Sequence, residues 1–128
     1  MIKKTLHTIW PASAWSLVIF ILLIIPGKDL PPGPGIPHLD KIIHTVLFGG
    51  QVWLWSTYFK NKGSFKTLAG IFFLVFFLSC TYGIGMEYYQ KYFVVNRDFE
   101  VGDILADIAG SALGWLIVSI GNRKQAGI

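Results

Sequence analysis

Four long apolar runs dominate this sequence and leave few folds open to it. They cover about residues 9–25, 39–59, 67–88 and 101–120. A helix rises 1.5 Å per residue, so runs of this length reach across a hydrocarbon core of roughly 30 Å. Only 14% of the residues are charged, compared with roughly a quarter in soluble domains. The sequence therefore predicts an all-α integral membrane protein, a four-transmembrane-helix bundle made by a single domain, residues 1–128.

Basic residues indicate how the four predicted spans are oriented. An even number of spans puts both termini on one side, and cytoplasmic segments carry an excess of lysine and arginine. Seven basic residues lie at the termini or in the turn between the second and third runs, and four lie on the opposite side. The first group is Lys3, Lys4, Lys60, Lys62, Lys66, Arg123 and Lys124, and the second is Lys28, Lys41, Lys91 and Arg97. We expect an N-in/C-in, multi-pass protein of the cytoplasmic membrane.

The net charge of +4 does not indicate nucleic acid as a partner, because the basic residues are scattered beside apolar runs. The acidic residues are distributed far less evenly. All seven fall on the predicted outer side, and five of them lie between Gly83 and Asp107. Carboxylates enclosed by two apolar runs need partners, because an ionisable group inside a membrane is costly and normally faces other protein groups or water.

Polar residues gather where three predicted spans reach the outer leaflet. Residues spaced three or four apart share one face of a helix, so each pair of polar residues at these helix ends points the same way. We predict that the three ends and the loop before the fourth span together form a polar site in the outer leaflet. Its members are Asp40, His44, Glu87, Gln90, Arg97, Asp98, Asp103 and Asp107.

Two purely structural interpretations compete with a functional site. Asp40 and Asp103 lie near helix N-termini, where the helix dipole favours acids. The residues His44, Glu87, Arg97 and Asp107 also make sense as an interhelical network that holds three helices together. Separately, Ala106, Gly110 and Gly114 recur every four residues, which predicts a stripe along which another helix can approach closely.

Three spaced motifs together resemble the VanZ-like membrane proteins over about residues 36–114. They are Asp40-Lys41-x-x-His44, Glu87-x-x-Gln90, and Arg97-Asp98 followed by Asp103 and Asp107. The family pattern often has an asparagine three positions after the last aspartate, where this chain has Gly110. The resemblance implies a link to low-level resistance to the glycopeptide teicoplanin. It does not bring an agreed molecular activity with it.

The first functional hypothesis is a protein that binds or handles a cell-envelope lipid. Teicoplanin acts on peptidoglycan precursors outside the cell, so an outer-leaflet site is well placed to meet one. The expected partners are membrane lipids, a lipid-linked cell-wall precursor or the lipoglycopeptide itself. Arg97 and Lys41 would meet a phosphate or carboxylate. A homodimer remains among the assemblies that the sequence allows.

The second hypothesis is a membrane enzyme acting on a lipid head group. Carboxylates from Glu87, Asp103 and Asp107, with the imidazole of His44, offer ligands for a divalent metal. His44 or Glu87 would serve as a general base. The chain has no GxSxG or HExxH motif and no evident cofactor site, so a divalent metal is the cofactor that stays open. Loss of function on Glu87→Gln and on chelation would favour this hypothesis.

The third hypothesis is a proton-coupled transporter, because acids and histidines inside a membrane relay protons. Gln51 is the one large polar group expected near mid-membrane, and four spans form a narrow pathway. A transporter of this size would therefore need a dimer.

Overall fold

A computed structural model describes residues 8–29, 33–62, 65–125 and 127 of the chain. Within these ranges the protein forms four α-helices and one 3₁₀ turn, and it forms no strand. The elements are α2 (Ile9–Ile24), η1 (Gly27–Asp29), α3 (Leu39–Lys60), α4 (Phe65–Phe93) and α5 (Val101–Gln125). The prediction of an all-helical fold is confirmed. Lys3 and Lys4, which entered the orientation argument, lie outside the described residues.

The helices follow the four apolar runs but extend beyond two of them. The runs at 9–25 and 39–59 match α2 and α3 to within one residue, whereas α4 continues past residue 88 to Phe93 and α5 continues past residue 120 to Gln125. Hydropathy identifies the part of a helix that is apolar enough to lie in lipid. The helix itself can continue into polar residues, because its backbone hydrogen bonds do not depend on hydropathy. Helix α4 ends just before a turn in which Asn96 adopts a positive φ of 57°.

Two of the described helices are long and apolar enough to cross a membrane. They are α4 from Leu68 to Phe93, and α5. Helix α2 is apolar but has 16 residues, or about 24 Å of helix. Large apolar side chains also lie exposed on the outer faces of these helices, among them Leu17, Ile21, Phe73, Phe77, Leu113 and Ile117. Such surfaces are typical of helices that face lipid.

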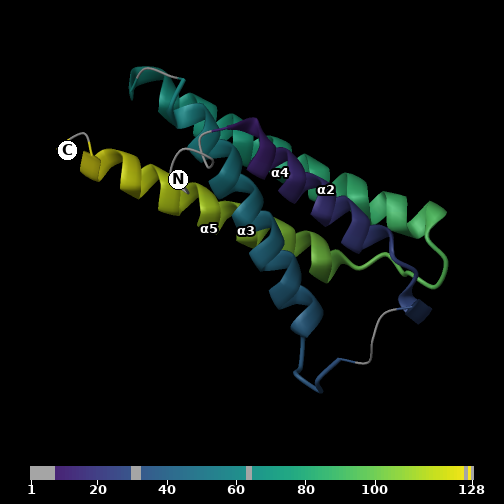
Figure 1. The fold of residues 1–128 in the computed structure, drawn as a ribbon. Coiled ribbons are helices and arrows are strands. Elements are labelled where there is room, and N and C mark those ends of the chain that lie inside the picture. Colours follow the sequence, from purple (N-terminus) through teal and green to yellow (C-terminus); the bar gives the residue numbers. More distant parts are fainter. Residues whose placement is uncertain (1–7, 30–32, 63–64, 126, 128) are drawn as a thin grey trace.

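Successive helices run in opposite directions (Figure 1). The last turns of α2 and α4 and the first turns of α3 and α5 therefore lie at the same end of the molecule. We call this the acidic end, because every acidic residue of the chain lies within two turns of these helix ends or in the segments that connect them. The fold thus gathers carboxylates that are up to 78 positions apart, from Asp29 to Asp107.

Helices α3 and α5 cross in close contact (Figure 1). A Cβ atom built on Gly114 would lie 2.6 Å from the carbonyl oxygen of Gly49, and one on Gly110 would collide with the carbonyl oxygen of Thr45. The predicted close approach along the small-residue stripe is confirmed, because nothing larger than glycine fits at these two positions.

Helix α2 packs against α3 and α4 through an apolar core and several hydrogen bonds. The core contains Ile19, Leu23, Leu47, Phe48 and Met86. The indole of Trp15 donates to the carbonyl oxygen of Leu47 at 2.8 Å, and the hydroxyl of Tyr82 donates to the carbonyl oxygen of Ser16 at 3.0 Å. Each bond ties α2 to a different neighbouring helix.

Gln51 is bound within a local polar network in the middle of the fold. Its Oε1 accepts a hydrogen bond from the hydroxyl of Ser16 at 3.0 Å, and that hydroxyl accepts one from the indole of Trp55 at 3.0 Å. Beside this network lies a mostly apolar cavity of about 210 Å³. Its walls are formed by Gln51, Trp55, Phe59, Val75, Leu78, Ser79 and Tyr82.

Candidate functional site

The deepest contact at the acidic end joins His44 of α3 to Asp107 of α5. Nδ1 of His44 lies 2.7 Å from Oδ1 of Asp107, and the two residues are 4% and 1% exposed. Both side chains stand about one turn inside their helices, so the pair forms only because the two backbones meet at Gly110. This contact confirms that an interhelical polar pair exists here, as the spacing of the polar residues suggested.

Glu87 reaches the same region from α4. It is 1% exposed, and its Oε2 accepts a hydrogen bond from the backbone N–H of Glu100 at 3.1 Å. The turn between α4 and α5, with Asn96 in the left-handed region, brings that N–H to Glu87. One turn earlier on α4, a Cβ atom on Gly83 would lie 2.6 Å from Oδ2 of Asp107, so glycine makes room for the aspartate.

Two carboxylate oxygens in this region have no hydrogen-bond partner among the residues that the structure describes. They are Oε1 of Glu87 and Oδ2 of Asp107, and both are buried. Buried polar atoms nearly always have a partner, so each orphaned oxygen calls for an explanation. A proton, an ordered water or a bound cation would each supply one.

Lys41 lies closer to the surface and binds three carboxylates at once. Its Nζ lies 2.8 Å from Asp40, 2.9 Å from Glu100 and 3.2 Å from Asp103. The side chain is 31% exposed, so the ammonium occupies the boundary between the buried cluster and solvent. Asp103 connects the two levels, because its Oδ1 faces Lys41 and its Oδ2 lies 3.7 Å from Nε2 of His44.

The remaining predicted site residues lie around the cluster rather than in it. Nε2 of Gln90 donates to the carbonyl oxygen of Leu23 at 2.8 Å, and Nε of Arg97 donates to that of Ile25 at 3.2 Å. These two residues hold the end of α2. Asp40 and Asp98 are exposed.

Of the eight predicted residues, four converge in the buried cluster. They are His44, Glu87, Asp103 and Asp107. Glu100 was missed, although its backbone binds Glu87 and its side chain binds Lys41. Its place among the five acidic residues between Gly83 and Asp107, three positions before Asp103, was the available signal.

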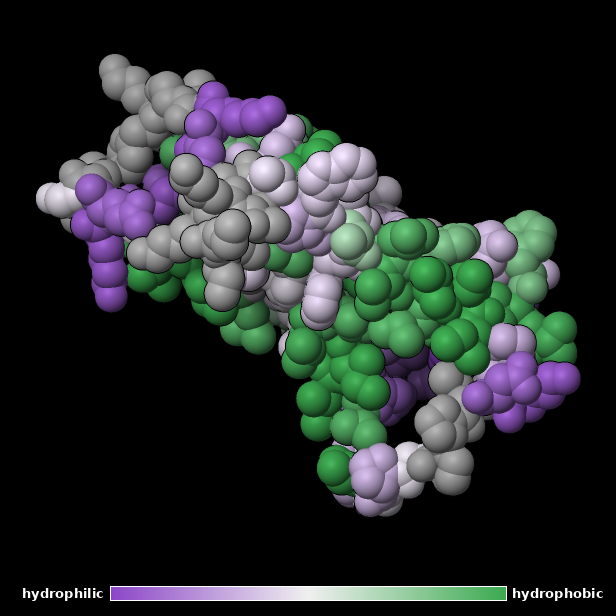
Figure 2. Space-filling view, in the orientation of Figure 1, coloured by the Kyte–Doolittle hydropathy of each residue, from purple (hydrophilic) through white to green (hydrophobic). Residues whose placement is uncertain are grey.

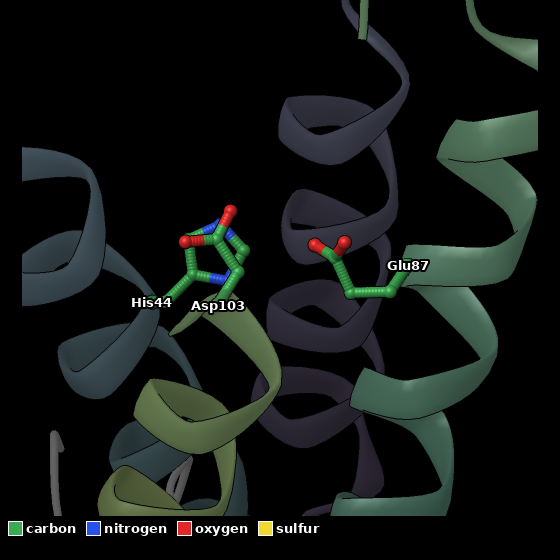
Figure 3. A group of neighbouring side chains, drawn as sticks. All are labelled: His44, Glu87 and Asp103. Carbon is green, nitrogen blue, oxygen red and sulfur yellow. The ribbon is translucent and has the colours of Figure 1, made fainter. Parts of the chain in front are cut away.

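The surface of the molecule is hollowed at the acidic end (Figure 2). Figure 2 shows hydrophilic surface inside this hollow and hydrophobic surface along part of its rim. In the close-up, the carboxylate of Glu87 points towards His44 and Asp103 (Figure 3). Side chains from three helices thus meet in one buried space, which suits the arrangement to binding a cation or moving a proton.

Comparisons with known proteins place the chain in a family. No curated protein matches it, and no solved structure matches it either. A family model described as VanZ/LLP1 does match, over residues 2–122. Because this match covers nearly the whole sequence, the chain belongs to the VanZ/LLP1 family.

Proposed function

We propose that this protein crosses the cytoplasmic membrane four times, with both termini inside and its acidic end in the outer leaflet. There it binds the head group of a cell-envelope lipid, a polyprenyl phosphate or a lipid-linked peptidoglycan precursor, and lowers susceptibility to teicoplanin-type glycopeptides. Family membership, the two long apolar helices and the excess of basic residues near the termini support this proposal.

The observation that carries the proposal is a buried polar cluster from three helices, at an end of the molecule where Figure 2 shows a hydrophilic hollow with hydrophobic surface along part of its rim. A lipid has the same two parts, a polar head joined to apolar chains. Pockets that bind such ligands are mostly apolar and contain a few convergent polar groups. The acidic end combines these properties at one place.

Lys41 supplies the positive charge for an anionic head group. Its ammonium is held by Asp40 and Glu100, whose side chains are 53% and 52% exposed, and by the buried Asp103. Exposed ion pairs are weak, so a phosphate oxygen exchanges readily with either exposed carboxylate. Asp103 keeps the ammonium in position while this exchange takes place. Arg97 has a different role in this proposal, because its guanidinium binds the end of α2.

The hydrocarbon chain of the lipid has two apolar surfaces available to it. One is the outer face of α4 and α5, where large apolar side chains are exposed. The other is the cavity of about 210 Å³ between α3 and α4. Gln51 on the cavity wall lies seven residues after His44, or about 10 Å further along α3. A lipid bound at Lys41 would extend its chain in that direction.

Lipid binding can be tested directly with the full chain in nanodiscs of phosphatidylethanolamine and phosphatidylglycerol. Native mass spectrometry would measure the retention of added undecaprenyl phosphate by the wild type, Lys41→Gln and Lys28→Gln. Lys28 is an exposed lysine at the same end and serves as the matched control. We expect Lys41→Gln to lower retention at least tenfold and Lys28→Gln to leave it unchanged. Equal retention by all three proteins would refute the proposed contact.

A cellular test connects binding to resistance. Cells carrying His44→Ala, Glu87→Ala, Arg97→Ala or Asp107→Ala would be challenged with teicoplanin while the surface level of each variant is measured. The proposal expects the cluster variants to lose more resistance than any fall in their surface level accounts for. If every variant merely failed to accumulate, the cluster would have a structural role only.

The second candidate function is enzymatic turnover of a lipid head group. The contact between His44 and Asp107 favours it, because a carboxylate on Nδ1 orients an imidazole so that Nε2 can act as a base. Release of inorganic phosphate from a polyprenyl pyrophosphate, abolished by His44→Asn, would distinguish turnover from binding. Transport has less support, because Gln51, Ser16 and Trp55 bind one another.

A further inference from the structure

Three potential ligand atoms converge inside the acidic end. Nitrogen or oxygen atoms of His44, Glu87 and Asp103 all lie within 4.8 Å of one another, which is close enough for one ion to touch all three. The residues come from α3, α4 and α5, and their side chains project into the same space (Figure 3). All three are buried, with exposed fractions of 4%, 1% and 6%.

An orphaned atom indicates independently that this space receives a ligand. Oε2 of Glu87 is occupied by the N–H of Glu100, but Oε1 is buried and has no partner in the described chain. The carboxylate of Glu87 points towards His44 and Asp103 (Figure 3). A cation between these side chains would bind the free oxygen without disturbing the hydrogen bond that Oε2 already makes.

His44 is oriented as a metal ligand would be. A carboxylate can only accept a hydrogen bond, so the 2.7 Å contact with Asp107 places the proton of a neutral imidazole on Nδ1. Nε2 then carries the lone pair. It lies 3.7 Å from Oδ2 of Asp103, too far for a hydrogen bond, so it remains available to an ion. Metal-bound histidines regularly donate their other N–H to a carboxylate in this way.

Charge balance leads to the same conclusion. The carboxylates of Glu87, Asp103 and Asp107 are buried around one imidazole. An ion pair between His44 and Asp107 would neutralise a single carboxylate and would leave Oε1 of Glu87 unpaired. Lys41 neutralises only part of the charge on Asp103, because its ammonium also forms ion pairs with Asp40 and Glu100. A dication is the simplest group that matches the remaining charge.

A second set of acids at this end does not provide an alternative site. Asp40, Glu100 and Asp103 also have oxygens within 4.8 Å of one another. However, the Nζ of Lys41 lies within 3.2 Å of a carboxylate oxygen from each of them. The ammonium already provides the positive charge for that group.

We propose that His44 Nε2, Glu87 Oε1 and Asp103 Oδ2 bind one divalent first-row transition metal ion, with Asp107 as the positioning residue for His44. An imidazole nitrogen favours Zn²⁺ over Mg²⁺ and Ca²⁺, which prefer oxygen ligands alone, and the two carboxylates also suit Mn²⁺. Three protein ligands leave at least one coordination position free. In the proposed function that position takes an oxygen of the lipid head group, and this extension rests on that function. Binding of the ion itself does not depend on it.

The test uses the purified full chain in detergent, stripped of metal with a chelator and then freed of the chelator. Isothermal titration with Zn²⁺ or Mn²⁺ should give one site per chain and a higher melting temperature. Glu87→Gln keeps the size of the side chain but removes its charge, and it should weaken binding at least tenfold. Asp107→Asn should weaken it by about 10- to 100-fold, the range for residues that orient a metal ligand. Asp40→Asn and Asp98→Asn, at exposed positions, should bind like the wild type.

If a variant fails to fold, metal binding can still be tested with the wild-type protein alone. With one equivalent of Mn²⁺, electron spin-echo spectroscopy should detect a directly coordinated imidazole nitrogen. Absence of stoichiometric binding by folded wild-type protein, or equal binding by folded Glu87→Gln, would overturn the inference. No lipid is present in this experiment, so its failure would leave the retention of polyprenyl phosphate as an independent result.

Discussion

Oδ1 of Asp107 on α5 lies 2.7 Å from Nδ1 of His44 on α3, at a depth where both side chains are almost completely buried. The two residues are 63 positions apart and meet because glycines remove the side chains that would separate their helices. The pair therefore depends on the helix packing and also contributes to it.

Removal of Asp107 should destabilise the fold. Asp107→Ala leaves the imidazole of His44 buried without its carboxylate partner. Interhelical hydrogen bonds in membrane proteins average about 0.6 kcal/mol, whereas removing one partner of a buried ion pair costs about 3–5 kcal/mol. We expect a loss between these values, measured by unfolding in mixed micelles of increasing denaturing-detergent content. Asp98→Ala, at an exposed loop position, is the control, and equal stability of the two variants would contradict the prediction.

The contact between α3 and α5 should not tolerate a methyl group. Gly110→Ala places a Cβ atom against the carbonyl oxygen of Thr45, which should reduce stability by about 1–3 kcal/mol through overpacking. Gly121 lies on the same helix, and an added Cβ atom there would have nothing within 4 Å, so Gly121→Ala serves as the control. That control should be neutral, or stabilising by up to about 1 kcal/mol, because alanine favours helix. Thermal melting in detergent measures both effects.

Gln90 should hold the last turn of α2 against α4. Gln90→Leu keeps a side chain of similar size but removes the donor to the carbonyl oxygen of Leu23. A loss of about 0.5–1.5 kcal/mol is expected for one hydrogen bond. Limited proteolysis should then cleave faster after α2, and more so when combined with Arg97→Ala. The exposed neighbour Lys91 supplies the control variant, Lys91→Ala, which should be cleaved at the wild-type rate.

The orientation can be measured by cysteine labelling. Cys80 is the chain's single cysteine, so Cys80→Ala gives a background free of thiols. Into this background Asp98→Cys and Arg123→Cys are introduced separately, both at exposed positions. A membrane-impermeant maleimide should label the Asp98→Cys variant on intact cells and the Arg123→Cys variant only after permeabilisation. The opposite pattern would place the acidic end in the cytosol and would remove the basis for the lipid proposal.

The helical fold was predictable because apolar runs report directly which segments form long helices. The spacing of Gly110 and Gly114 likewise predicted the close approach of α5 to another helix, since small residues at every fourth position have few other uses. The polar residues near the ends of three runs predicted that these helix ends lie together at one end of the molecule. The runs did not predict that α4 and α5 extend further, because helix ends depend on backbone hydrogen bonds and not on hydropathy.

The partners within the site were less predictable, because they depend on how far each helix is rotated and where the loops pass. Arg97 looked like a ligand-binding cation, yet it donates to Ile25 at the end of α2. Glu100 contributes through its backbone N–H, which no side-chain pattern reveals. Lys41 was expected to meet a ligand, but its contacts with Glu100 and Asp103 follow only from the crossing of α3 and α5.

The glycine contacts fix the geometry of three of the four cluster residues. His44, Asp103 and Asp107 belong to helices whose backbones touch, so their mutual geometry is rigid. Glu87 belongs to α4. Its carboxylate accepts a hydrogen bond from the backbone N–H of Glu100, the residue just before α5. Glu87 is therefore the one cluster residue whose position depends on a helix outside the crossing of α3 and α5. A substitution that shifts α4 would change the distance from the Glu87 carboxylate to the other three groups and would leave the distances among those three unchanged.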